Sequence, residues 1–166
     1  EMLNRDWSSD VCSSDLEAFR ALLQTLQSRL QDMTLAMTGI GAEMESRVSR
    51  RFETRTDPVG RPWDGWAEAT IKNYPYPGTP AAIKAGRSGN ARLLDRYGDM
   101  LQGLSYQADA NSVRVGFDQS YASFHEFGTR RMPRRSLLMA APEAGTLAPD
   151  DERAVIDVLG DFLFQQ

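Results

Sequence analysis

The chain has 166 residues, of which 41% are hydrophobic and 25% are charged. This length and composition are typical of one soluble globular domain. No apolar run approaches the roughly 20 residues that a membrane-spanning helix needs, and the first residues lack the basic-then-apolar pattern of a signal peptide. We therefore expect a cytoplasmic protein and exclude the membrane-spanning and secreted classes.

The N-terminal segment stands apart from the rest of the chain. Residues 6–16 read DWSSDVCSSDL and resemble a translated sequencing adapter. We interpret residues 1–16 as a disordered, non-native scar and set them aside; the alternative is an ordinary Ser/Asp-rich disordered N-terminus. Cys12 is the only cysteine, so the natural chain is expected to lack disulfides and thiolate metal sites. Leaving out Asp6, Asp10 and Asp15 moves the formal net charge from -4 to -1.

The remaining charge is unevenly distributed. Residues 72–135 contain ten basic and five acidic side chains, whereas residues 136–166 contain one basic and six acidic side chains. Opposite charges in two parts of a nearly neutral chain favour head-to-tail contact between identical subunits. The alternative is two unrelated solvated faces.

Residues 17–53 have the apolar pattern of a long helix. Their apolar positions follow one another at steps of three or four residues, namely Leu22, Leu26, Leu30, Met33, Met37, Ile40, Met44, Val48 and Phe52. Asp32 offers an N-cap, and Gly39 and Gly41 each weaken a helix by about 1 kcal/mol, so two helices or one bent helix fit best. The apolar stripe needs a cover, which is either this domain's sheet or a neighbouring subunit.

The middle of the chain is rich in turn-forming residues. Asp57, Pro58 and Gly60 predict a turn that ends the helix and delivers Trp63 and Trp66 to the core or to an interface. Residues 67–73 are compatible with one short helix. Residues 74–92 contain three prolines and three glycines, which predicts a flexible loop that becomes ordered on contact with a partner.

The second half predicts a hairpin and a terminal helix. Residues 93–100 indicate a short helix or turn, and alternating apolar residues predict strands at 104–108 and 113–117. A helical turn at 121–127 ends at Gly128, a basic loop follows at 130–135, and residues 137–140 suggest a further strand. Pro149 and three acidic residues begin a last helix. The predicted fold is α+β, with a long N-terminal helix or helix pair packed on a small antiparallel sheet and with a C-terminal helix, in one domain over 17–166.

Three short motifs of the chain occur in an order that is also found in a known family. They are Arg51-Phe52 with Asp57-Pro58-Val59-Gly60-Arg61-Pro62-Trp63, then Leu93-Leu94 with Gly98, then Tyr121-Ala122, His125 and Gly128 followed by Met132-Pro133-Arg134-Arg135 and Leu137-Leu138. Together they resemble the phage virion morphogenesis family, which includes tail-completion proteins of Mu-like and P2-like phages.

The resemblance has departures. The family usually has a small hydroxyl residue at Tyr97, a small residue at Arg134, a proline at Ser136, an aromatic residue at Leu137 and a glycine at Met139. These changes leave the predicted fold as it is, and they leave the geometry of the loop around Arg135 open.

The resemblance implies a structural role late in tail or neck assembly. Such a protein is expected in the host cytoplasm during assembly and afterwards in the virion, as a homo-oligomeric ring that contacts other phage tail or neck proteins. It implies no cofactor and no membrane.

The residues themselves offer little chemistry. His125 is the only histidine, and one histidine without cysteine does not make a typical zinc site. His125 and Glu126 are adjacent, so on a helix they point about 100° apart and do not form an acid/base pair. No motif of a known catalytic class is present, so we expect no enzyme and no metal, and we expect the His125 ring to bond a backbone carbonyl. An uncharacterised enzyme stays a further hypothesis, beside a phage assembly protein and a nucleic-acid-binding protein.

The arginines at 130–135 have two interpretations. One is contact with phosphates, which would make the chain a small nucleic-acid-binding protein. The other is subunit contact, with Arg135 pairing a carboxylate from the acidic segment at 150–152. We favour subunit contact, because no nucleic-acid-binding motif is present, and expect Arg135→Glu to disrupt assembly while leaving the monomer folded. The interface or structural candidates are Phe52, Asp57, Pro58, Gly60, Trp63, Leu94, Gly98, Tyr121, His125, Gly128, Arg130, Arg131, Pro133, Arg134 and Arg135.

Overall fold

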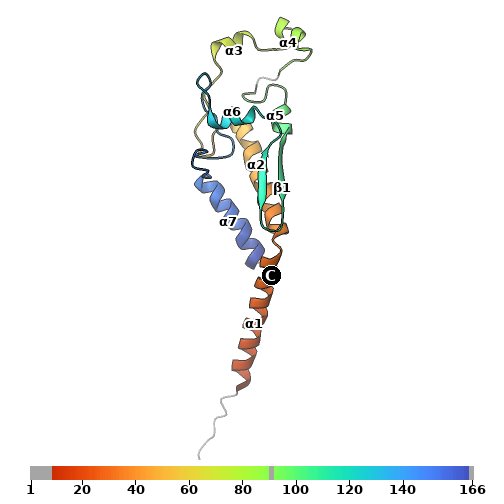
Figure 1. Cartoon of the computed structure of the whole chain (residues 1–166), viewed down its shortest axis with the longest axis vertical. Helices are drawn as coiled ribbons and strands as arrows, with labels where there is room; N and C mark the ends of the chain where they lie inside the picture. The colour runs from red at the N-terminus through yellow and green to blue at the C-terminus, as the bar shows by residue number, and fades with distance from the viewer. Residues whose placement is uncertain (1–8, 90–91, 165–166) are drawn as a thin grey trace, which may run out of the picture.

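The computed structural model describes residues 9–89 and 92–164, which form an elongated molecule (Figure 1). In chain order the elements are α1 (Ser9–Gln31), α2 (Thr34–Thr54), α3 (Glu68–Lys72), α4 (Pro80–Ala85), α5 (Asp99–Gln102), β1 (Leu104–Ala108), β2 (Val113–Phe117), α6 (Ala122–Phe127) and α7 (Pro149–Phe164). The strands pair in one two-stranded antiparallel sheet. The predicted α+β fold with N-terminal helices and a C-terminal helix is confirmed.

The predicted break in the N-terminal helix lies at residues 32–33. The Asp32 carboxylate accepts a hydrogen bond from the Thr34 backbone N–H at 2.9 Å, and the Met33 N–H donates to the Ala110 carbonyl of the hairpin turn at 3.1 Å. The N-cap of α2 is Met33, which makes no side-chain cap bond, so Asp32 is not the predicted N-cap; its carboxylate lies one residue earlier and still satisfies the first backbone donor of α2.

Helix α1 begins earlier than the sequence suggested. Residues 9–16, which we expected to be disordered, continue the helix, because residues 9–31 contain no proline or glycine to stop its propagation. Residues 6–8 of the adapter-like segment lie outside the described residues. In Figure 1, α1 runs away from the rest of the molecule.

The core lies around the second half of α2. This helix contacts the hairpin and also α7, and its Phe52 ring meets Trp63 and Phe117 edge-on at centroid distances of 5.9 and 6.1 Å. Val48 and Leu137 are completely buried in the same cluster. The apolar stripe predicted along α2 is therefore covered within the chain.

The hairpin lies close against α2 because of one glycine. The two strands form the predicted hairpin, and their register pairs Leu104 with Phe117 and Ala108 with Val113. A Cβ atom added at Gly41 would lie 2.3 Å from the Tyr106 ring. The glycine that we interpreted as a weak point of the helix is thus the site where the strand approaches it.

Helix α7 is fastened at its far end to α1. The Arg29 guanidinium donates to the carbonyls of Phe162 and Leu163 at 2.9 and 2.8 Å. These carbonyls belong to the last turn of α7, where helical carbonyls have no partner within the helix.

The segment at 74–92 is more structured than a plain loop. Tyr74 is only 3% exposed and stacks on Trp66 with a centroid distance of 4.5 Å. Helix α4 starts where the Thr79 side chain accepts from the Ala82 N–H, and Pro80 at the first helical position favours that start. The prediction of a flexible loop over residues 74–92 did not include helix α4. Residues 90–91 lie outside the described part of the chain.

Candidate assembly interface

The Asp57–Trp63 motif forms a hydrogen-bonded turn. The Asp57 carboxylate accepts from the backbone N–H groups of Val59 and Arg61 at 3.0 and 2.8 Å, and the Gly60 N–H donates to the Asp57 carbonyl at 3.0 Å. This turn delivers Trp63 into the core. Pro58, another candidate, lies in the same turn.

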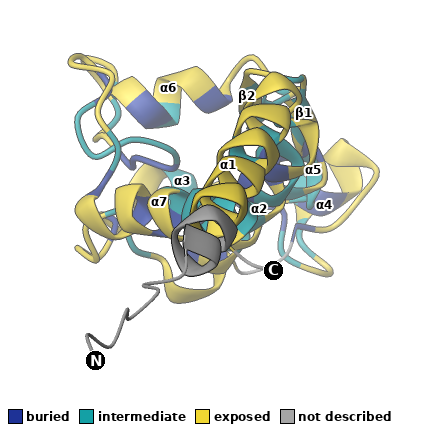
Figure 2. Ribbon diagram, turned by 90° about the horizontal axis from the view of Figure 1, so that it is seen from below, coloured by how far each residue is buried: buried dark blue, intermediate teal, exposed yellow. Residues whose placement is uncertain are grey.

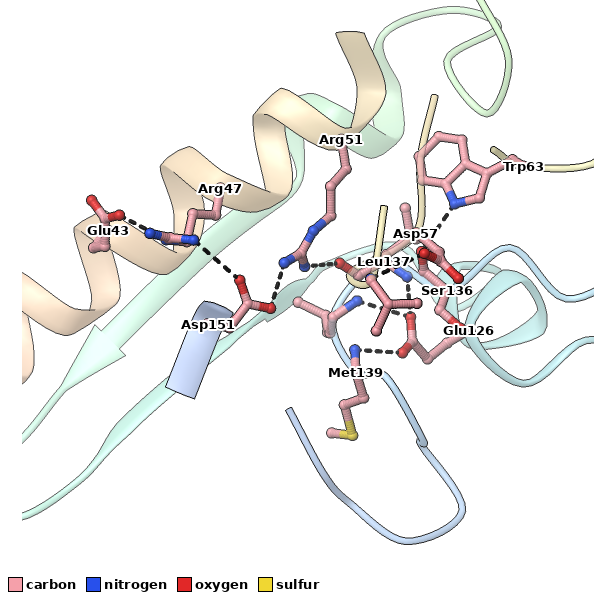
Figure 3. A network of polar contacts seen from close by, with 12 residues as sticks. Glu43, Arg47, Arg51, Asp57, Trp63, Glu126, Ser136, Leu137, Met139 and Asp151 are labelled. Atoms are coloured by element: carbon pink, nitrogen blue, oxygen red, sulfur yellow. Dashed lines mark hydrogen bonds and ion pairs between the residues drawn. The ribbon is translucent and has the colours of Figure 1, made fainter. Parts of the chain in front are cut away.

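The turn and the 130–139 loop are joined by the Trp63 side chain. Its indole N–H donates to the Ser136 carbonyl at 3.1 Å, across 73 residues of sequence. Two of the three stretches that carried the family resemblance are therefore held together (Figure 3).

Glu126 fixes the end of the 130–139 loop through hydrogen bonds. The sequence did not predict this role. Its buried carboxylate accepts from the backbone N–H groups of Leu137, Leu138 and Met139 at 2.6, 3.0 and 2.8 Å (Figure 3). The strand predicted at residues 137–140 is wrong, because these donors bond a side chain instead of a neighbouring strand. One signal for the burial of Glu126 was available in the sequence. It follows the apolar Ala122 by one helical turn and so lies on the same face of α6.

Arg51 and Asp151 form the second buried polar contact that holds this loop. The Arg51 guanidinium donates to the Leu137 carbonyl at 2.6 Å and pairs with the Asp151 carboxylate. Asp151 is only 1% exposed and also lies 3.7 Å from Arg47. Asp151, the middle residue of the acidic segment at 150–152, is therefore buried in an ion pair of its own chain and is not accessible to an arginine of another subunit.

Arg135 also faces inward. Its guanidinium donates to the carbonyls of Asp64 and Gly65, both at 2.7 Å, and its backbone N–H donates to the His125 carbonyl at 2.8 Å. The residue is 6% exposed, and burial lowers the pKa of its guanidinium. The expected contact between Arg135 and a carboxylate of another subunit is wrong, because neutral carbonyls of its own chain occupy the side chain.

The other arginines of the loop divide into two kinds. Arg134 bonds the Ser136 hydroxyl at 2.5 Å and the Ala140 carbonyl at 2.6 Å. Arg130 and Arg131 are exposed, next to the exposed Pro133, and within the described residues they form no ion pair. Within the described part of the chain, Arg130 and Arg131 are therefore free of ion pairs on the surface, whereas the exposed Arg134 is hydrogen-bonded within its own loop.

Gly128 explains how α6 turns into the loop. It has a φ of +74°, and a Cβ atom there would lie 3.2 Å from the Arg134 backbone nitrogen. The predicted end of the helix at this glycine is confirmed, and no other residue type fits both the angle and the close approach.

A cavity of about 810 Å³ opens on the other side of this loop. Residues of α3, α5 and α6 contribute to its lining, and these helices lie at the end of the molecule opposite α1 (Figure 1). Five arginines and five aromatic or imidazole rings contribute to its lining, namely Arg87, Arg92, Arg96, Arg131, Arg135, Trp66, Tyr74, Tyr97, Tyr121 and His125. Two further candidates also line or border it, Leu94 with a φ of +63° and Gly98 at the start of α5.

His125 differs from its expected role. Its ring Nδ1 is buried and has no hydrogen-bond partner in the described part of the chain, so the predicted bond from the ring to a backbone carbonyl is absent there. Burial lowers the pKa of His125, and the nearby Arg135 charge lowers it further. A neutral imidazole therefore lies at the cavity wall, with Tyr121 edge-on at 6.4 Å.

The second surface feature is the apolar side of α1. Its large apolar residues are about half exposed, including Phe19 at 55% and Leu30 at 53%. Figure 2 shows most of α1 from residue 15 onward in the colour of exposed residues. The half of the stripe on α1 is thus uncovered, in contrast to the half on α2.

Residues 9–89 and 92–164 lack two features that mark other classes of protein. They contain no group of three His, Cys, Asp or Glu side chains placed to hold a metal ion. None of their helices combines the length and apolarity that crossing a bilayer requires.

Comparison with known proteins identifies the family of the chain. The model of the phage virion morphogenesis family matches residues 14–163. The chain belongs to that family. Its matched region includes the described buried contacts around Glu126, Arg51 and Trp63, and all of the uncovered apolar stripe from Leu16 onward.

Curated relatives of this family member come from a prophage. The chain is 27% identical over 126 residues to the Mu-like prophage FluMu G protein 1 of Haemophilus influenzae, covering 74% of this chain and 75% of that protein. It is 26% identical over 126 residues to FluMu G protein 2 of the same organism, covering 76% and 75%. No solved structure matches the chain. These likenesses support a structural role in assembling a phage particle.

Proposed function

We propose that this protein completes the tail or joins head to tail during virion assembly. In this role it forms a homo-oligomeric ring that contacts other tail or neck proteins, is made in the host cytoplasm and ends in the virion. The uncovered apolar stripe of α1 carries the proposal, since a part built for contact with other subunits needs such a surface before assembly.

The stripe has the spacing that helices use to pack on one another. Phe19, Leu23, Leu26 and Leu30 follow at intervals of four, three and four residues, which is the seven-residue repeat of paired helices. Residues 17–31 of α1, which follow the adapter-like segment, form a helix about 22 Å long. A surface of this length leaves many apolar side chains in water until another subunit covers them.

The test replaces Leu23 and Leu30 together by glutamate. We expect this variant to stay folded, lose self-association in size-exclusion chromatography with light scattering, and fail to complement a phage that lacks the gene. A matched control replaces the exposed Gln24 and Gln31 on another side of α1 by glutamate. Normal particles with the Leu23 and Leu30 variant would contradict the proposal.

A second candidate function is binding of nucleic acid, which the exposed Arg130 and Arg131 favour. A monomer whose DNA affinity falls steeply with salt would support that function, because phosphate contacts release counterions. We favour assembly because Arg134 and Arg135, the other half of the predicted basic loop, are engaged inside the chain.

A further inference from the structure

The cavity between α3, α5 and α6 has no part in the proposed use of α1. We propose that it is the docking site for helix α7 of a second copy of this chain, which inserts Phe164 and pairs its acidic side chains with the arginines at the cavity mouth. The inference rests on the proposed function, since it names the partner and the contact that would link one subunit to the next.

The charge of the lining calls for an anionic occupant. Five arginines line the cavity, and Asp99 is the only carboxylate among the lining residues. Asp99 is already engaged by Arg87, at 2.5 Å. Arg131 is exposed and forms no ion pair within the described residues, so its positive charge remains to be matched.

The walls also suit an aromatic side chain. Trp66 and Tyr74 stack on each other, and the Arg87 guanidinium covers the Tyr97 ring at 3.8 Å. Aromatic rings favour offset or edge-on contact with a further ring. A partner that combines carboxylates with an exposed aromatic side chain would therefore fit both the charge and the surface of the cavity.

Helix α7 has this combination on one stripe. Asp157, Asp161 and Phe164 follow at intervals of four and three residues, so they share a face of the helix. Both aspartates are exposed, and Phe164 is 72% exposed. An exposed phenylalanine beside two carboxylates has no evident role in the isolated chain.

The same chain cannot make the contact with itself. The cavity lies at the end of the molecule where α3 and α6 are found, whereas the last turn of α7 lies beside α1 toward the other end (Figure 1). The contact must therefore come from another copy. Such a head-to-tail contact repeats from subunit to subunit and closes into a ring when the rotation between subunits permits.

Charge reversal in both partners tests the inference. We expect Arg131→Glu alone, and Asp161→Lys alone, each to raise the dissociation constant of self-association by about tenfold or more. The double variant restores opposite charges across the contact, so its self-association should return toward that of the wild type. Sedimentation velocity of the full chain measures all of them, and thermal unfolding verifies that each variant is folded.

Matched controls are available on α2. Arg50→Glu and Glu53→Lys change net charge by the same amounts at exposed positions away from the cavity, and they should leave self-association unchanged. A third variant, Phe164→Ser, should weaken it without any change of charge.

Two results would overturn the inference. One is self-association that the single charge reversals leave intact or that the double variant does not restore. If the variant with glutamate at Leu23 and Leu30 still abolished assembly in that case, the proposed function would stand without the contact between α7 and the cavity. The other is an Arg131→Glu protein that self-associates normally but no longer binds a single-stranded oligonucleotide that the wild type binds, which would make nucleic acid the occupant.

Discussion

At the scale of single residues, charged side chains of this protein act mainly as internal fasteners. Glu126, Arg51 and Arg135 each satisfy backbone groups of a segment that has no strand partner. Buried backbone donors and acceptors need such partners, because an unpaired one is destabilising. The loop at 130–139 thus owes its conformation to Glu126 and Arg51, which bond its backbone from outside, and to its own Arg135, which bonds the carbonyls of Asp64 and Gly65.

Arg135 allows this view to be tested against the interpretation from the sequence. Arg135→Glu would place a carboxylate against the carbonyls of Asp64 and Gly65, so we expect unfolding to become easier by about 3 kcal/mol or more. The matched control, Arg130→Glu, alters an exposed side chain and should change stability by less than about 0.5 kcal/mol. Urea titration followed by circular dichroism measures both. Equal stability of the two variants would show that Arg135 is a surface contact after all.

At this scale the sequence predicted the roles of residues that act on their own local backbone, but not the roles of residues whose partners are distant in the chain. The turn residues Asp57 and Gly128 were recognisable because their roles depend on local backbone geometry. Glu126 was not, since its three partners lie 11 to 13 residues away in a segment that has no regular structure. Arg135 was misjudged for the same reason, because a run of arginines has the same composition whether its members face outward or inward.

At the scale of elements, the contact between α2 and the hairpin depends on a missing side chain. Gly41→Ala places a methyl group 2.3 Å from the Tyr106 ring. Alanine favours a helix over glycine by about 1 kcal/mol, but the overlap forces the strand outward, which typically costs about 1 to 3 kcal/mol. We therefore expect a net loss of stability in thermal unfolding.

A second variant separates the two effects in Gly41→Ala. When the alanine is combined with Tyr106→Ala, the overlap disappears, and alanine at position 41 should become neutral or stabilising relative to Tyr106→Ala alone. A destabilising effect of similar size in both backgrounds would rule out the overlap as its cause.

Elements with local signals were the most predictable. The hairpin, the break at Asp32 and the start of α7 followed from alternation, capping and charge at a helix end. Helix α4 was missed because proline and glycine dominate residues 74–92, and the Thr79 cap that starts it is a weak signal by comparison. The cavity could not be predicted at all, because its lining comes from four separate stretches of the chain.

At the scale of the whole molecule, the chain divides into a packed body and a projecting helix. Deletion of residues 1–16 should change the free energy of unfolding of the body by less than about 0.5 kcal/mol, because surface changes remote from packed features have small effects. The first described contact of α1 with another element through a hydrogen bond comes only at Arg29. A differential scanning calorimetry trace with a large loss of stability would show that this segment belongs to the cooperative unit.

Helix α7 is held at both ends, by Asp151 on Arg51 near its start and by Arg29 on its last carbonyls. Mechanically, that makes α7 a brace between the core and the root of α1. We expect tension applied to α1 to be shared by two parallel routes, the junction at Asp32 and helix α7, and so to leave the contact between α2 and the hairpin in place.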